Sequence, residues 1–144
     1  MSIRYQHTQR GTLMLIVLTV AALTAAVAAY SDPGSGRAIG LAIACGLVVL
    51  AWVFSSLTAV VNGEELRWYF GPGAWSYRMA LGDIEDVRIV RNTWLNGFGI
   101  RMRPGFRLYN VSGLDAVELR LKNGEIRRIG TDDATGLAAA LHAG

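Results

Sequence analysis

Charged residues are missing from two long stretches of this 144-residue sequence. None occurs in the 21 residues between Arg10 and Asp32, or in the 26 residues between Arg37 and Glu64. The chain has 17% charged and 52% hydrophobic residues, whereas a soluble domain usually has about 25% charged residues. The uneven distribution excludes a single compact soluble domain, and the high apolar content excludes a disordered chain.

Residues with catalytic or metal-binding chemistry are also scarce. The single cysteine, Cys45, allows neither a disulfide within the chain nor a zinc-ligand spacing. The two histidines, His7 and His142, lie near opposite ends of the sequence, and no nucleophile motif such as G-x-S-x-G occurs. We therefore expect a protein that is not an enzyme and that has no catalytic residue, metal or cofactor.

Two acidic clusters are the exceptions to this scarcity. They are Asp83-Glu85-Asp86 and Asp132-Asp133, and carboxylates so grouped could serve a metal or acid–base chemistry. The first cluster stands where a turn enters a predicted strand, and the second stands at a predicted helix start. A structural role is the expected one for both.

The positive net charge does not indicate a nucleic-acid partner. It is +3 for the whole chain, but from residue 64 onward 11 basic residues face 10 acidic ones, which leaves +1. A domain so nearly neutral has no strong field for phosphate groups. We expect no nucleic acid among the partners.

The two uncharged stretches predict a helical membrane hairpin. Residues 12–30 would form a helix of roughly 28 Å and residues 38–61 one of roughly 36 Å, while the hydrocarbon core of a bilayer is about 30 Å thick. The polar linker between them is so short that the two helices must be antiparallel neighbours. The expected organisation is a tail over residues 1–11, a two-helix hairpin over 12–61 and a further domain over 62–144.

A cleaved signal peptide is the alternative for the first stretch. Arg4 and Arg10 would supply its positively charged start, and Ala26-Val27-Ala28 resembles a cleavage site. The apolar stretch is longer than a usual signal-peptide core, and a second one follows almost at once. We therefore favour an anchor that the mature protein keeps.

Basic residues at the ends of the stretches indicate the orientation. Arg4 and Arg10 precede the first stretch, Arg67 and Arg78 follow the second, and the linker has only Arg37. Cytoplasmic flanks carry an excess of Arg and Lys. We therefore expect both termini in the cytoplasm and the linker on the other side.

From residue 65 the pattern becomes an alternation of apolar and polar residues, which predicts short strands. The alternation is clearest over residues 117–121, after which Asn123-Gly124 predicts a type I′ turn into another strand. The run Thr131-Asp132-Asp133 then offers an N-cap and an acidic first turn to a helix over residues 134–141. About seven strands followed by one helix are expected.

Several motifs in this region resemble the bacterial pleckstrin-homology-like (PH-like, bPH) families of small membrane proteins, in which a two-helix anchor often precedes the domain. The resemblance covers roughly residues 63–141 and rests on Leu81-Gly82-Asp83-Ile84-x-x-Val87, Trp94-x-x-Gly97-x-Gly99-Ile100-Arg101, Leu108-Tyr109-Asn110-Val111-Ser112-Gly113, Val117-Glu118-Leu119 and Arg128-Ile129-Gly130-Thr131-Asp132. It implies a partly open barrel of antiparallel strands that the C-terminal helix closes. The expected fold class is thus a membrane α-helical hairpin followed by a mostly β, α+β domain.

The same resemblance carries expectations about function. It implies a non-enzymatic binding or assembly module in the bacterial cytoplasmic (inner) membrane. Its partners would be membrane lipids, another membrane protein or a second copy of the chain. Two other hypotheses stay open, an anionic-lipid or small-anion sensor and an enzyme with an unfamiliar site.

Arginine side chains are the candidate binding residues. Arg101 and Arg103 are two residues apart and so share one face of a strand, and Arg107 follows just beyond the next turn. If the two strands pair, the three guanidinium groups could hold a phosphate or carboxylate together, with Arg91 and Trp94 nearby. The alternative is a solvated basic face that only attracts anionic lipid.

Aromatic residues follow directly after the second apolar stretch. Trp68, Tyr69 and Trp75 are candidates for an aromatic belt at the membrane interface, together with Tyr77. The same positions suit the interior of a small barrel, since alternate residues of a strand must point inward. We expect the set to divide between the two roles.

Overall fold

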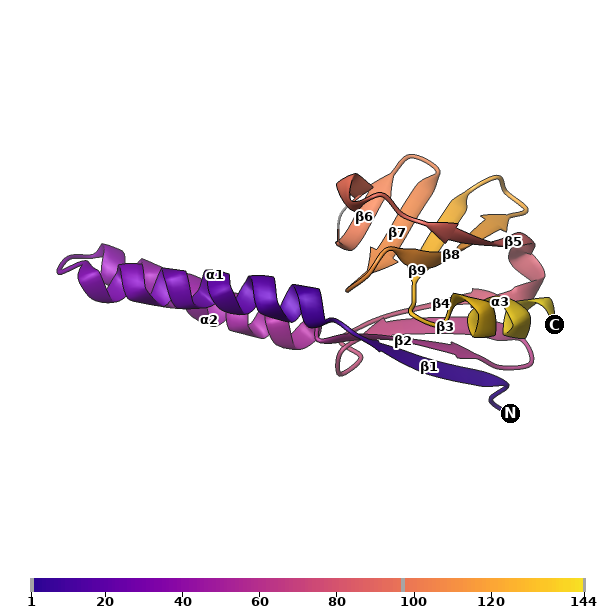
Figure 1. Ribbon diagram of the computed structural model, residues 1–144, viewed down its shortest axis with the longest axis horizontal. Helices are drawn as coiled ribbons and strands as arrows, with labels where there is room; N and C mark the ends of the chain where they lie inside the picture. Colours follow the sequence, from indigo (N-terminus) through magenta and orange to yellow (C-terminus); the bar gives the residue numbers. More distant parts are fainter. Residues whose placement is uncertain (1, 97, 144) are drawn as a thin grey trace.

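The computed structural model describes residues 2–96 and 98–143 and consists of a long helical hairpin joined to a two-sheet domain (Figure 1). Gly97, which forms part of one resemblance motif, lies outside the described residues. The hairpin projects from one end of the domain, and the short C-terminal helix covers the opposite part of it. A helical hairpin followed by a mostly β domain is therefore confirmed.

The hairpin consists of α1 (Thr12–Ser31) and α2 (Gly36–Val53). Small residues form their contact: a Cβ atom on Gly40 would lie 2.6 Å from the Cβ atom of Ala29. In the loop, the Asp32 carboxylate accepts a hydrogen bond from the Gly34 amide at 2.7 Å. The backbones can approach closely because neither Gly40 nor Ala29 has a side chain beyond Cβ.

Most apolar side chains of the hairpin have no protein partner. Only 11% of the apolar stretch in α1 and 17% of that in α2 is buried. Both helices are long and apolar enough to cross a membrane. Contiguous exposed apolar surface of this extent is rare on soluble monomers, and it suggests association with a membrane.

The second apolar stretch is not one helix over residues 38–61, as predicted. Its helical part ends at Val53, and its last six residues form the strand β2 (Ser56–Val61). This strand lies in the middle of a sheet, and Leu57 on one face and Thr58 on the other are both buried. An apolar strand buried on both faces has no alternation that distinguishes it from a helix, which is why the pattern misplaced the boundary.

The N-terminal residues also differ from the prediction of a tail over 1–11. Tyr5–Arg10 form the strand β1, which pairs antiparallel with β2 from Tyr5↔Val61 to Arg10↔Ser56. The helical hairpin is therefore an insertion in the turn of a β-hairpin (Figure 1). The sequence did not predict β1 because this strand is polar and Gln9 is its one buried residue. The Gln9 side chain donates a hydrogen bond to the Ser112 carbonyl oxygen at 2.7 Å.

Two sheets make up the domain. The first has the strand order β1-β2-β3-β4 and the second has the order β5-β8-β9-β7-β6. All neighbouring strands are antiparallel except β7 and β9, which are parallel. The remaining bounds are β3 (Glu65–Phe70), β4 (Trp75–Ala80), β5 (Ile84–Arg91), β6 (Gly99–Arg103), β7 (Phe106–Asn110), β8 (Asp115–Leu121), β9 (Ile126–Gly130) and α3 (Ala134–His142).

The described residues thus form nine strands where about seven were predicted. The two additional ones are β1 and β2, on either side of the hairpin. The helix prediction over 134–141 is confirmed, and Asp133 caps α3 by accepting a hydrogen bond from the Gly136 amide at 3.1 Å. The prediction of a type I′ turn at Asn123-Gly124 is wrong. Such a turn needs a positive φ at both central residues, and Gly124 has a φ of 85° but Asn123 has no positive φ.

The core lies between the two sheets and under α3. Its centre is a group of aromatic rings, in which Trp68 stacks on Tyr77 at 5.7 Å and Tyr109 lies 5.2 Å from Trp68 between ring centroids. Leu119 and Ile129 of the second sheet and Leu137 of α3 complete it, all fully buried. Burial of these large side chains is the main force that holds the two sheets together.

Gly11 joins β1 to α1 at a point where the backbone returning from α2 comes very close. A Cβ atom on Gly11 would lie 2.3 Å from the Phe54 carbonyl oxygen, and the Gly11 amide donates to the Ser55 carbonyl oxygen at 2.7 Å. We expect Gly11→Ala to lower the free energy of unfolding by roughly 1–3 kcal/mol, because a backbone atom must move.

Denaturant unfolding in mild detergent, followed by near-UV circular dichroism, measures this change. Gly82→Ala is the matched control, since a Cβ atom there would have no neighbour within 4 Å. Equal midpoints for the two variants would contradict the close approach of the two chain segments.

Candidate membrane-facing site

Aromatic side chains surround the point where the helices leave the domain. Phe54, directly after α2, packs edge-on against Phe70 at 5.1 Å and lies 6.1 Å from Trp75. Trp75 is 47% exposed, and Trp52 in the last turn of α2 is also exposed. Tryptophan at the end of an apolar helix is typical of a membrane–water interface.

The three aromatic residues predicted at that interface have separate positions. Trp75 lies at the base of the hairpin, as expected of an interface residue. Trp68 is 2% exposed in the core, so its predicted place at a membrane interface is wrong. Tyr69 is half-buried on the opposite face of β3, where the Arg67 guanidinium lies 5.4 Å from its ring centroid. Alternation along the strand causes this division, since Trp68 and Tyr69 point to opposite faces.

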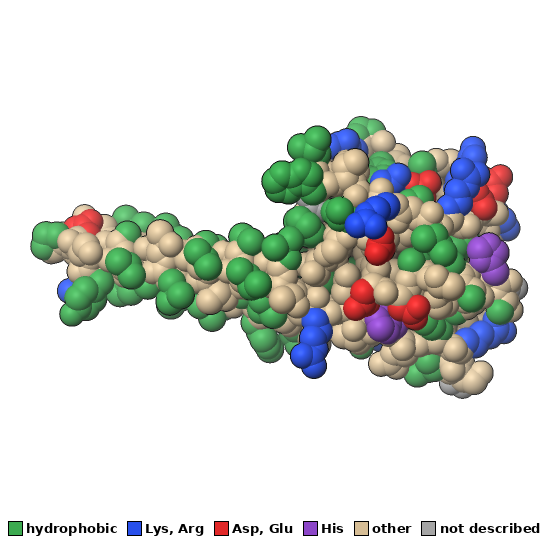
Figure 2. Space-filling model, in the orientation of Figure 1, with side chains coloured by type: hydrophobic (Ala, Val, Ile, Leu, Met, Phe, Trp, Pro, Cys, Tyr) green, Lys and Arg blue, Asp and Glu red, His purple; other side chains and the backbone are tan. Residues whose placement is uncertain are grey.

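The connection between β5 and β6 presents the most exposed apolar side chains of the domain. It contains a single 3₁₀ turn, Trp94–Asn96, in which Trp94 is 77% and Leu95 82% exposed. Figure 2 shows hydrophobic side chains gathered over this corner of the domain, on the side from which the hairpin projects. The sequence predicted Trp94 but not Leu95, although an apolar pair within a polar loop was a usable signal.

A groove of about 680 Å³ connects this loop to the first turns of α1. Leu13, Met14 and Val17 form its helical wall. Trp94, Phe98 and Leu114 form the opposite wall, and Arg101 is the one charged side chain that lines it. The groove is thus continuous with the apolar surface of the hairpin and has a guanidinium group beside it.

The predicted arginine cluster is divided between two faces of the second sheet. Arg101 and Arg103 share one face of β6 and are exposed, as the alternation predicted. Arg107 pairs in register with Met102 and therefore points to the other face. The strands do pair, but the register of the turn puts Phe106, not Arg107, opposite Arg103. The expectation of three guanidinium groups at one site is wrong.

Arg91 takes no part in the groove. Its side chain is largely exposed, and its Nη1 atom lies 3.8 Å from a carboxylate oxygen of Asp115 on the neighbouring strand. A surface ion pair of this kind contributes little to stability. Of the five predicted binding residues, the groove brings together only Trp94 and Arg101.

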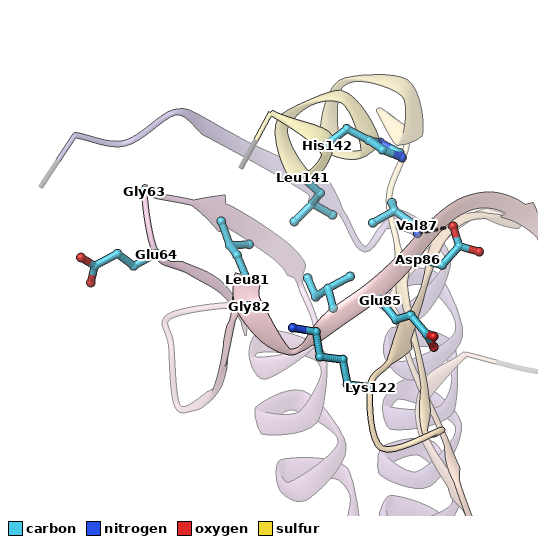
Figure 3. Close-up of a pocket in the computed structure, with 11 residues that line it drawn as sticks. Gly63, Glu64, Leu81, Gly82, Glu85, Asp86, Val87, Lys122, Leu141 and His142 are labelled. Carbon is cyan, nitrogen blue, oxygen red and sulfur yellow. Dashed lines mark hydrogen bonds between the residues drawn. The ribbon is translucent and has the colours of Figure 1, made fainter.

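A second cavity of about 570 Å³ lies beside α3 (Figure 3). Leu141 projects into it from α3, whereas the Glu64 carboxylate points away (Figure 3). Asp86, at its margin, accepts a hydrogen bond from Arg88 at 2.6 Å, and this guanidinium lowers the pKa of the Asp86 carboxyl. Glu85 pairs with Arg120 at 3.5 Å. Arginines thus neutralise two members of this acidic cluster, which agrees with a structural role.

Each of the two histidine side chains contacts one polar group of the domain. His7 Nε2 pairs with an Asp132 carboxylate oxygen, and His142 Nδ1 lies 2.8 Å from the Ala138 carbonyl oxygen. Among residues 2–96 and 98–143, no three His, Cys, Asp or Glu side chains are grouped so that they could hold a metal ion. The candidate site therefore consists of the exposed apolar side chains of Trp94 and Leu95 and the guanidinium group of Arg101 beside the groove.

Comparison with models of known protein families finds none that matches this chain, and comparison with curated protein sequences finds no matching relative.

The position of the Trp94–Leu95 loop beside α1 generates a test. In a Cys45→Ala background reconstituted in liposomes, a nitrobenzoxadiazole (NBD) label on Leu95→Cys should emit at shorter wavelength than a label exposed to water, because a hairpin that crosses the bilayer would bring this loop to the level of the lipid headgroups. The same label on Asn123→Cys, in the turn between β8 and β9, is the matched control and should emit at the longer wavelength typical of a label in water. Equal emission from both positions would contradict a membrane-facing loop.

Proposed function

We propose that this chain is a non-enzymatic, membrane-anchored binding and assembly module of the PH-like type. It acts in the bacterial cytoplasmic membrane, and its partner is another membrane protein or a second copy of the chain. Membrane lipids surround the hairpin and adjoin the groove. The proposal depends chiefly on one observation, the insertion of the two apolar helices between the paired strands β1 and β2.

This insertion fixes the domain relative to the helices. The Gly11 amide donates to the Ser55 carbonyl oxygen at 2.7 Å, and the Gly71 amide donates to the Ser56 carbonyl oxygen at 2.9 Å, so no flexible linker separates hairpin and sheet. A domain held at one height and one angle above a membrane presents the same surface to every neighbour. Such pre-organisation suits an assembly contact, since less freedom is lost on binding.

The orientation also follows from the insertion, together with charge. Because β1 and β2 belong to one sheet, both flanks of the hairpin lie on the same side of a membrane that it crosses. Arg4 and Arg10 precede α1, and Arg67 and Arg78 follow α2 in β3 and β4. At the far end of the hairpin the one basic residue is Arg37, in the first turn of α2. The excess favours the cytoplasm for the domain and both termini.

The exposed side chains of Trp94 and Leu95 form the surface that we propose as the contact with a protein partner. Large exposed apolar side chains beside a membrane anchor are typical of contacts between membrane proteins. Neither histidine lines the groove beside these residues, since His7 contacts Asp132 and His142 contacts a main-chain carbonyl oxygen. These features favour a binding module over an enzyme.

Chemical crosslinking of the full chain in its own membrane, followed by purification in mild detergent, tests this function. We expect a defined crosslinked species, either a homo-oligomer or a complex with one membrane protein. The double variant Trp94→Ser/Leu95→Ser should reduce its yield roughly tenfold, as the loss of a central apolar contact does in other interfaces. Ile3→Ser, which removes another exposed apolar side chain, before β1, is the matched control. A chain that stays monomeric in native membranes would contradict the proposal.

Recognition of anionic lipid is a second candidate function, favoured by the position of Arg101 at the edge of an apolar groove. A lipid chain would occupy the groove while the guanidinium contacts the phosphate. Native mass spectrometry of the full chain, purified with phosphatidylglycerol, should show less retained lipid for Arg101→Gln. Arg88→Gln removes an exposed guanidinium on β5 outside the groove and should retain as much lipid as the natural chain. Equal retention by both variants would exclude this candidate.

A further inference from the structure

A narrow cleft of about 240 Å³ lies between the two sheets, away from the membrane-facing groove. Trp68 and Tyr77 of the first sheet form one wall of it. Arg107, Tyr109 and Arg127 of the second sheet form the other. Aromatic rings and guanidinium groups therefore face the same small space.

The two guanidinium groups of the second sheet are neighbours. Arg107 and Arg127 are register partners on the parallel strands β7 and β9, on the face that also carries Tyr109 and Ile129. Like charges side by side on adjacent strands repel each other unless a negative group lies with them. Glu125 pairs with Arg127, but no carboxylate among the described residues forms an ion pair with Arg107.

Two buried N–H groups on residues that line this cleft lack an acceptor. They belong to Arg127 Nη1 and to Trp68 Nε1, and neither has a hydrogen-bond partner. Trp68 is 2% exposed, and the Arg127 side chain is 11% exposed. Buried donors nearly always have partners in folded proteins, so two unpaired donors on residues that line one cleft, beside a guanidinium that forms no ion pair, point to a missing acceptor.

We propose that this cleft binds a small organic anion. Its carboxylate or phosphate group accepts hydrogen bonds from Arg107, Arg127 Nη1 and Trp68 Nε1. Its compact body lies against the rings of Tyr77 and Trp68, which favours a flat or ring-bearing molecule. The inference goes beyond the proposed function and does not depend on it.

The dimensions of the cleft limit the ligand. Its volume is that of about eight water molecules at ~30 Å³ each, which is below the usual range of pockets for drug-sized ligands. Asp83 and Glu125 also line it, and their carboxylates disfavour ligands with several negative charges. A molecule with one anionic group fits both limits.

A free anion fits the location better than a lipid headgroup. In β3 and β4, the pair nearest to the helices is Phe70 and Trp75, and both lie close to Phe54. Trp68 and Tyr77 form the next pair on that face, about 7 Å farther from the hairpin. Arg101, which lines the groove beside α1, lies on the opposite face of the second sheet from Arg107.

Nuclear magnetic resonance of the tryptophan indole N–H groups tests this site in the full chain in detergent micelles. Inorganic phosphate, benzoate and phenyl phosphate are titrated separately to millimolar concentration, and Trp68→Phe identifies the resonance of Trp68. We expect a saturable shift of that resonance with at least one probe, larger for the two aromatic probes than for phosphate. The resonances of Trp52 and Trp94 should not move.

Two variants then test whether the anion binds on the face of the second sheet that carries Arg107 and Tyr109. Arg107→Gln should weaken binding roughly tenfold or more, since a neutral amide replaces a charged, bidentate donor. Arg103→Gln, on the opposite face of the same sheet, is the matched control and should bind like the natural chain. If Arg107→Gln does not fold, the titrations of the natural chain still decide.

Three outcomes would overturn the proposal. The first is that no probe shifts the Trp68 resonance. The second is that Arg103→Gln and Arg107→Gln weaken binding equally, which indicates general surface attraction. The third is a shift that appears only in nanodiscs with phosphatidylglycerol, which assigns the cleft to a lipid headgroup. The experiment requires no protein partner, so its failure leaves the assembly function untouched.

Discussion

The pairing of β1 with β2 is the contact on which the rest of the structure depends. It joins the two ends of an apolar helical hairpin whose side chains are mostly exposed, and it places those ends in a sheet that also encloses the core. Anchor and domain therefore share a continuous hydrogen-bonded backbone. The groove beside α1 lies where the two parts meet, because one wall comes from α1 and the other from β6 and the segments before β6 and β8.

The sequence predicted the parts of the fold that have strong local signals. The absence of charge revealed the hairpin, and the residues around Asp133 revealed the C-terminal helix and its cap. The boundary near Val53 and the strand over Tyr5–Arg10 were missed for a physical reason. The pattern of an apolar strand buried on both faces resembles that of a helix, and a polar edge strand resembles an unstructured tail. Pairing with distant strands, and not the local pattern, determines that these segments form strands.

The candidate sites show the same division between local and long-range information. Alternation correctly put Arg101 and Arg103 on one face, but the register beyond the turn decides the position of Arg107, and no local pattern encodes that register. The parallel pairing of β7 with β9, which brings Arg107 beside Arg127, joins segments that are 20 residues apart. Trp68 was placed at the membrane because the alternation of its strand does not say which face is inside.

The position of the hairpin inside the first β-hairpin also sets an order for biogenesis. β1 leaves the ribosome first, but its partner β2 follows only after both apolar helices have been made. The first sheet can therefore close only when α1 and α2 lie antiparallel and bring Arg10 back to Ser56. A chain whose helices fail to insert would leave an open sheet edge and an uncovered core, both recognisable to chaperones and proteases. Completion of the first sheet thus depends on the two helices lying antiparallel beside each other.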